Sequence, residues 1–177
     1  MRALVSEKIG DAAVRLTRDE ALARMAERYF ISRSPATFED FVWWSGLNVG
    51  DCGRAVEMIG GSLHPERWKG RDFLVHERSR SRGFRSGSVI LLPPYDEYLI
   101  IYKSRDIVLA PEFSHKAHNN SGIFKPVVAV DGEIVGNWSP TSKDGNVTFF
   151  RDEFGDEALC RARSVFGRHF PAHDYLK

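Results

Sequence analysis

Helix-start signals recur three times in the early part of this chain, and a hairpin signal follows them. Each is a Thr or Asn with an acidic residue three positions later: Thr17 with Glu20, Thr37 with Asp40, and Asn48 with Asp51. Such a side chain caps a helix by accepting a hydrogen bond from the third backbone amide of the helix, and the acid can bond back to the cap. We therefore predict three consecutive short helices.

Apolar side chains follow each signal at helical spacing, so each predicted helix has one face suited to a core. Ser34-Pro35 ends the first helix, Gly46 the second and Gly60-Gly61 the third. The apolar positions are Leu22, Met25, Ala26, Tyr29 and Phe30, then Phe38, Phe41, Val42 and Trp44, then Cys52, Ala55, Val56 and Ile59.

A β-hairpin is indicated directly after the third helix. Leu63 to Trp68 and Arg71 to His76 read as strands, and Lys69-Gly70 reads as the turn between them. Three helices followed by a hairpin is the order of a winged helix-turn-helix. We predict such a domain over residues 16–87.

The run from Leu91 to Asp106 begins in a buried strand, Val89 to Leu92, that two prolines terminate. Asp96 then has the position of a cap for a short helix. The expected orientation has Leu99, Ile100 and Tyr102 facing inward and Lys103 and Arg105 outside.

The rest of the chain predicts a small antiparallel sheet closed by a helix, which makes the fold class α+β. This second domain, residues 88–177, is expected to pack as one unit with the first. Its expected parts are strands at Phe124 to Val130, Glu133 to Trp138 and Asn146 to Arg151, turns at Asp131-Gly132 and Asp144-Gly145, and a helix from Asp156 to Phe170 with Leu159, Ala162, Val165 and Phe166 inward.

Three segments of the chain, in the same order, resemble motifs of the bacterial winged-helix DNA-binding family that includes the interstrand-crosslink DNA glycosylases. Arg28 to Leu47 is similar to its "RYL…GPAT…DF-x-WWSGL", although Ser34 stands where the family usually has Gly. Leu91 to Asp106 is similar to "LLP-aromatic-Asp-x-Tyr-Leu…Tyr-x-x-Arg", and Gly122 to Trp138 to "G-x-F-x-PVV-x-VDG-x-VVG-x-W". The resemblance extends from Leu16 to Arg168.

The resemblance implies the fold and a DNA-binding role. Family glycosylases are longer proteins whose catalytic signature is a Gln-x-Gln or Gln-x-Asp motif in the N-terminal portion. This chain contains no glutamine. No catalytic residue is therefore assigned, and we expect this chain alone not to be an enzyme, whatever a longer parent protein does.

Basic residues are the candidate DNA-binding residues, although the whole chain carries a formal net charge of only +1. On the third helix, Arg54 faces outward together with two acids, Asp51 and Glu57. The basic stretch that follows is interleaved with Trp68 and Phe84, a pattern typical of phosphate contact combined with base stacking; a solvated loop is the alternative. Its members are Arg67, Lys69, Arg71, Arg78, Arg80, Arg82 and Arg85, against Glu66, Asp72 and Glu77.

Other chemistry is poorly supported by the sequence. Asp96 and Glu97 are candidates for acid–base work, but neighbouring residues of a helix do not face each other, so capping by Asp96 is preferred. His115 and His118 lack further ligands, and no phosphate loop or nucleophile motif occurs; we predict neither metal nor cofactor. Cys52 and Cys160 are expected to be buried free thiols.

The leading hypothesis is a non-catalytic winged-helix module that binds double-stranded DNA weakly, mainly through phosphates. One alternative is the C-terminal half of a DNA-repair glycosylase acting on alkylated or crosslinked DNA. Another is a protein-interaction or structural module, favoured by the near-neutral charge and the acidic third helix. With no signal peptide and no apolar run that could span a bilayer, a cytoplasmic protein without membrane contact is expected. The oligomeric state stays open.

Overall fold

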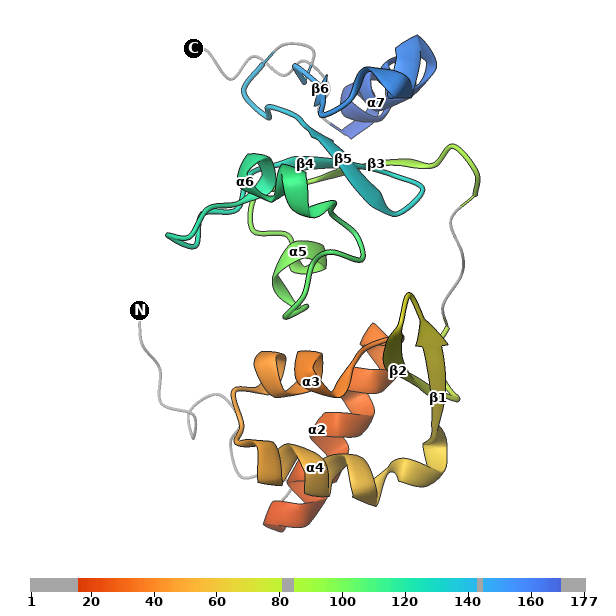
Figure 1. The fold of residues 1–177 in the computed structure, drawn as a ribbon, viewed down its shortest axis with the longest axis vertical. Coiled ribbons are helices and arrows are strands. Elements are labelled where there is room, and N and C mark those ends of the chain that lie inside the picture. Colours follow the sequence, from red (N-terminus) through yellow and green to blue (C-terminus); the bar gives the residue numbers. More distant parts are fainter. Residues whose placement is uncertain (1–15, 81–84, 143–144, 170–177) are drawn as a thin grey trace. The chain divides into compact units, whose positions relative to one another are not determined.

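The structure is a computed structural model that describes residues 16–80, 85–142 and 145–169. The chain divides into two compact units between Arg80 and Ser81 (Figure 1). Each unit has its own core and is described by itself. The packing of the two as one body stays a prediction.

The first unit contains α2 (Arg18–Arg33), α3 (Phe38–Ser45) and α4 (Val49–Met58), as the three start signals predict (Figure 1). Thr17 with Glu20 and Thr37 with Asp40 form complete capping boxes. The Asn48 side chain accepts a hydrogen bond from the Asp51 amide at 2.8 Å. Gly46 ends α3 with a left-handed backbone, φ 66°.

Aromatic rings form the core of the first unit. Tyr29, Phe30 and Phe41 are fully buried, with ring centroids 5.0 to 5.5 Å apart. Cys52 and Ala55 of α4 are also fully buried, so all three helices share this core.

The hairpin consists of β1 (Leu63–Trp68) and β2 (Arg71–His76), and its predicted bounds and turn are confirmed. On the other edge of β2, Leu74 exchanges two backbone hydrogen bonds with Ala36, which lies between α2 and α3; their N···O distances are 2.8 and 3.3 Å. β2 is therefore central, and β1, which contains Pro65, is an edge strand among the described residues.

The second unit is built on one antiparallel sheet of four strands in the order β3-β4-β5-β6 (Figure 1). The strands are β3 (Val89–Leu92), β4 (Val127–Val130), β5 (Glu133–Asn137) and β6 (Thr148–Phe149). The helices are α5 (Glu97–Ile100), α6 (Ser114–Ala117) and α7 (Gly155–His169). The predicted α+β class is thus observed.

Side chains of β4 alternate between two cores. Val128 packs in a cluster with Trp138 and with Phe166 of α7. Val127 and Ala129 belong to a second cluster with residues of the segment 99–117. Because successive residues of a strand point to opposite faces, α7 covers one face of the sheet and the segment containing α5 and α6 covers the other.

Three sequence expectations are wrong in detail. The strand predicted from Phe124 begins only at Val127, because Pro126 has no amide hydrogen for the ladder. The strand predicted over Asn146 to Arg151 is reduced to β6. Cys160 is exposed, because it lies outside the stripe of α7 that buries Ala162 and Phe166.

The expectation that Arg105 points outside is also wrong, since its side chain is half-buried in the second unit. Arg82, Phe84, Asp144 and Phe170 lie outside the described residues. Within the described ranges, no helix is long and apolar enough to cross a membrane.

Candidate nucleic-acid interface

The cation of α4 is held by a neighbouring helix. Arg54 forms an ion pair with Asp19 of α2 at 2.5 Å, and Arg18 of α2 pairs in return with Asp51 of α4 at 2.6 Å. A phosphate would have to compete with Asp19 for Arg54 and approach the nearby carboxylates. The outward residues of α4 also include Val49, which is 63% exposed, so this helix is poorly suited to phosphate contact.

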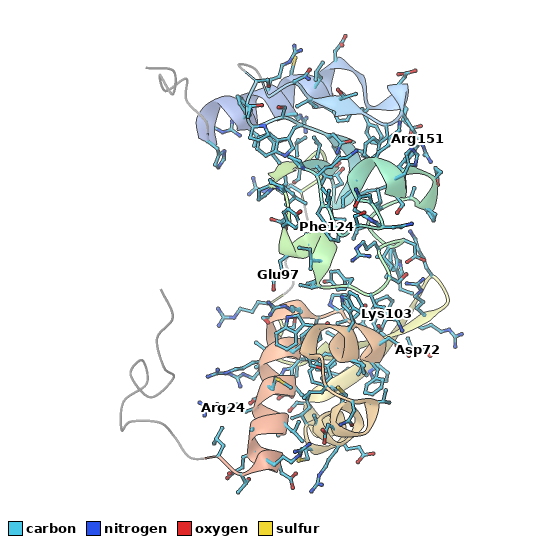
Figure 2. All side chains as sticks on the ribbon, turned by 90° about the vertical axis from the view of Figure 1, so that its left-hand side faces the viewer. Arg24, Asp72, Glu97, Lys103, Phe124 and Arg151 are labelled. Carbon is cyan, nitrogen blue, oxygen red and sulfur yellow. The ribbon has the colours of Figure 1, made fainter. Side chains whose placement is uncertain are left out.

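The hairpin tip, Arg67 to Arg71, brings three of the predicted cations together. Arg71 lies opposite Trp68 in the register, and Arg67 lies opposite Asp72 (labelled in Figure 2), 3.8 Å from its carboxylate. Opposed residues share a face of the hairpin, so Arg67 and Arg71 lie on different faces. Lys69 is in the turn, and its Nζ lies 4.5 Å from the centroid of the Trp68 ring.

The tip is open to solvent. Trp68 is 48% exposed, and both members of the Arg67–Asp72 pair are about three-quarters exposed. The left-handed backbone of Lys69 and Gly70, φ 46° and 76°, makes the turn tight. The arrangement presents positive charge and one indole ring on a short projection, which suits contact with phosphates and bases.

The remaining predicted cations lie elsewhere. Arg78 and Arg80 are exposed beyond the other end of β2, and Arg78 pairs with Glu27 of α2 at 3.2 Å. Arg85 is exposed in the second unit, where its carbonyl accepts the Ser88 amide at 2.9 Å. Arg82 falls outside the described residues. The predicted basic stretch is therefore divided into a tip group and separate members.

The second unit contains a cluster that was not predicted from the sequence, which we call the aromatic–cationic cluster: Tyr95, Arg105, His118 and Phe124. Phe124 (labelled in Figure 2) lies at its centre. The Arg105 guanidinium carbon, the His118 ring and the Tyr95 ring lie 5.1, 5.4 and 6.0 Å from the Phe124 centroid. His118 and Phe124 pair as an antiparallel bridge at the two ends of one short turn, whereas Tyr95 and Arg105 come from other parts of the chain. No spacing in the sequence indicates that these three parts meet.

Electrostatics within the cluster follow from burial. Burial lowers the pKa of Arg105 below its usual range, although the group stays a cation at neutral pH. Burial and the charge of Arg105 lower the pKa of His118, which favours the neutral imidazole. Its Nε2 lies 3.0 Å from the Ser114 hydroxyl.

Of the two neighbouring acidic residues Asp96 and Glu97, the first has a structural role. Asp96 caps α5, and its Oδ1 accepts the Tyr98 amide at 2.8 Å, as predicted. Tyr98 in turn donates its hydroxyl to the Gly132 carbonyl at 2.7 Å, which links α5 to the turn between β4 and β5. In the described part of the chain, no group of three or more His, Cys, Asp or Glu could hold a metal ion.

Comparison with known proteins extends the motif resemblance. The sequence profile of the family described as DNA glycosylase AlkZ-like matches residues 2–155. This chain belongs to the AlkZ-like family. The match covers both structural units, from the start of α2 to the start of α7.

A similar protein supports the assignment, and a solved structure shows a similar fold. The interstrand DNA cross-link repair glycosylase of Streptomyces sahachiroi is 30% identical over 141 residues, which are 76% of this chain and 38% of that protein. The solved structure of the DNA glycosylase AlkZ from the same organism has a TM-score of 0.70 at 24% identity, covering 90% of this chain and 47% of the other. The chain thus spans less than half the length of both relatives.

Proposed function

We propose that this AlkZ-like chain is a winged-helix module for DNA repair that binds duplex DNA, with the hairpin tip as its principal phosphate contact. It has no base-releasing chemistry of its own in this proposal. The open, positively charged hairpin tip is the observation that carries the proposal. In the Streptomyces relative the matched region belongs to a longer crosslink-repair glycosylase.

The order of elements in the first unit supports a winged helix. The chain runs through α2, the paired residue Ala36, α3, α4, β1 and β2, and Ala36 pairs with the returning strand of the hairpin. That order, with a short strand between the first two helices joining the hairpin, is typical of winged helices. In such folds the hairpin is the wing.

The charge distribution favours the wing over α4. The cation of α4 is held by Asp19, whereas Lys69 lies over the Trp68 ring, and Arg67 has a long, exposed pair with Asp72. Exposed pairs of that kind contribute little to stability, so a phosphate can replace Asp72 at small cost. Binding should be largely independent of sequence and steeply dependent on salt.

Duplex binding by the full chain tests the proposal, measured by fluorescence anisotropy at several salt concentrations. The triple variant Arg67→Ala, Lys69→Ala and Arg71→Ala removes the tip cations. Since each phosphate contact contributes about 0.9 to the slope of log affinity against log salt, the slope should decrease by roughly 2 to 3.

A matched control loses the same charge elsewhere, through Arg24→Ala, Arg28→Ala and Arg168→Ala, all exposed positions (Arg24 is labelled in Figure 2). The control should retain the salt slope. Equal weakening by both triple variants would mean diffuse attraction with no wing contact. Failure of the unsubstituted protein to bind duplex DNA at low salt would refute the function itself.

A second candidate function is that of one part of a glycosylase whose catalytic residues lie in another region of the protein. The coverage of 38% of the Streptomyces repair glycosylase favours it. Joining this chain to the catalytic portion of an AlkZ-like enzyme tests it: the joined protein should release an alkylated base, and the wing variant should weaken that release.

A further inference from the structure

We propose that the aromatic–cationic cluster of the second unit binds one nucleotide of an unpaired DNA strand, with its phosphodiester on Arg105 and its base stacked on Tyr95. The inference rests on the proposed function only in taking DNA as the ligand. It concerns a different unit, a different set of residues and a different form of DNA.

Arg105 supplies an oriented positive charge. Its Nε donates to the Leu99 carbonyl at 2.5 Å, and its guanidinium lies against the Phe124 ring. These contacts fix the plane of the group but supply no negative charge, and among the described residues no carboxylate pairs with it. A half-buried cation without a counter-ion is unfavourable, and the Nη atoms of an oriented guanidinium match the two oxygens of a phosphodiester.

The His118 imidazole adds a polar but uncharged group beside Phe124. Its ring lies against Phe124 at an interplanar angle of 34°, and its lowered pKa favours the neutral form at neutral pH. Arg105 therefore carries the positive charge of the cluster at neutral pH. A neutral imidazole can donate or accept one hydrogen bond from a ligand oxygen or amine.

Tyr95 has an unusual backbone conformation. Its φ is 60°, in the left-handed region that is unfavourable for a bulky side chain. The other described non-glycine residues with positive φ are Lys69 and Asp131, each before a glycine in a tight turn, and Asn146. Tyr95 also lies in a turn, which the Asp96 amide closes on the Pro93 carbonyl at 3.3 Å, but the turn position with positive φ is ordinarily glycine or asparagine. A bulky residue in this conformation is a candidate for a functional role.

The position of Tyr95 indicates what that function is. The ring is 56% exposed and meets Phe124 edge to face, and the Arg105 guanidinium lies against the same Phe124 ring. The cluster therefore combines a large solvent-exposed aromatic surface with a cation. Aromatic side chains next to a positive group are the usual means of holding unpaired bases, because every base can stack. A carboxylate ligand would satisfy Arg105 but would not use Tyr95.

The experiment measures binding of a fluorescein-labelled single-stranded oligodeoxynucleotide to the full chain by anisotropy. Tyr95→Ala should weaken binding by about fivefold or more, while Tyr95→Phe, which keeps the ring, should stay within about twofold. Arg105→Lys should also weaken it, because a lysine cannot replace the forked contact. Arg168→Ala on α7, which covers the opposite face of the sheet, is the control for charge and should bind normally.

A second measurement does not depend on the stability of any variant. Unlabelled thymidine dinucleotide, added to the unsubstituted protein, should shift the ring resonances of both Tyr95 and His118 in NMR spectra. Inorganic phosphate should shift His118 alone. A carboxylate-bearing peptide that shifts His118 as strongly as the dinucleotide, with no shift at Tyr95 from either, would overturn the nucleotide assignment.

The two proposals fail in different ways. If duplex binding depends on the wing but single-strand binding survives Tyr95→Ala, the nucleotide site is wrong and the proposed function stands. If Tyr95-dependent single-strand binding is found in a protein that ignores duplex DNA, the proposed function is wrong and the nucleotide site stands.

Discussion

Gly136 of β5 provides a sharp test of the packing in the second unit. A Cβ atom at this position would lie 2.6 Å from the Thr148 carbonyl oxygen and 3.2 Å from the Phe149 Cα. Both neighbours are backbone atoms of β6, so the clash cannot be relieved by rotating a side chain. Gly136→Ala must displace β6 from β5.

The expected loss of stability depends on how much of the sheet is displaced. Overpacking a tight core site typically costs about 1–3 kcal/mol. Because β6 pairs with β5 through only two residues, Gly136↔Phe149 and Asn137↔Thr148, the strand can shift without unfolding the rest of the sheet. We therefore expect Gly136→Ala to lower the free energy of unfolding of the second unit by about 2 kcal/mol.

Gly53→Ala in α4 is the matched control, because its expected change in the free energy of unfolding has the opposite sign. A Cβ there would meet nothing within 4 Å, and no positive φ is present. In a helix interior, alanine is more favourable than glycine by about 0.5–1 kcal/mol. Gly53→Ala should therefore stabilise the first unit by that amount.

Urea unfolding followed by circular dichroism measures both changes, and hydrogen exchange with mass spectrometry assigns each to its unit. Gly136→Ala should speed exchange in β5 and β6 and leave α2 unaffected. A Gly136→Ala protein as stable as the parent would refute the close approach of the two strands, and a destabilising Gly53→Ala would refute the open surroundings of α4.

Three further predictions concern single residues. Thr37→Ala should lower the free energy of unfolding of the first unit by about 1–2 kcal/mol in thermal or urea unfolding. The Thr37 cap is buried, so its removal leaves the Asp40 amide without its hydrogen-bond acceptor. The chain alone should release no base from alkylated or crosslinked DNA in a glycosylase assay; release that Asp96→Asn abolishes would show that this cap carries chemistry. Because the pKa of His118 is lowered on folding, the unfolded chain binds its proton first, so stability should fall as the pH drops below about 6.5, and less steeply in His118→Gln when melting temperatures are compared.

Local signals in the sequence predicted the first unit well. Thr37 and Asp40 lie three residues apart, so their mutual capping needs no knowledge of the rest of the fold. The turn at Lys69-Gly70 likewise fixes the strands on both sides of it. The order of three helices followed by a hairpin was predicted from these elements alone.

Contacts between distant residues were beyond such signals. Arg54 reads as an outward cation of α4, but its partner Asp19 is 35 positions earlier, on another helix. Arg105 was expected at the surface, but its guanidinium lies against the ring of Phe124, 19 positions later. The candidate wing was therefore found from the sequence, whereas the aromatic–cationic cluster was not.

The edge position of β1 has a consequence for the behaviour of the protein at high concentration. An open edge strand can recruit a strand from another molecule, and an exposed indole at its end, here Trp68, increases that tendency. Pro65 removes one backbone donor from the middle of β1, and Glu66 and Arg67 add charges beside it. The projection can thus expose an aromatic ring while resisting self-association, and replacing Pro65 by Val should promote aggregation.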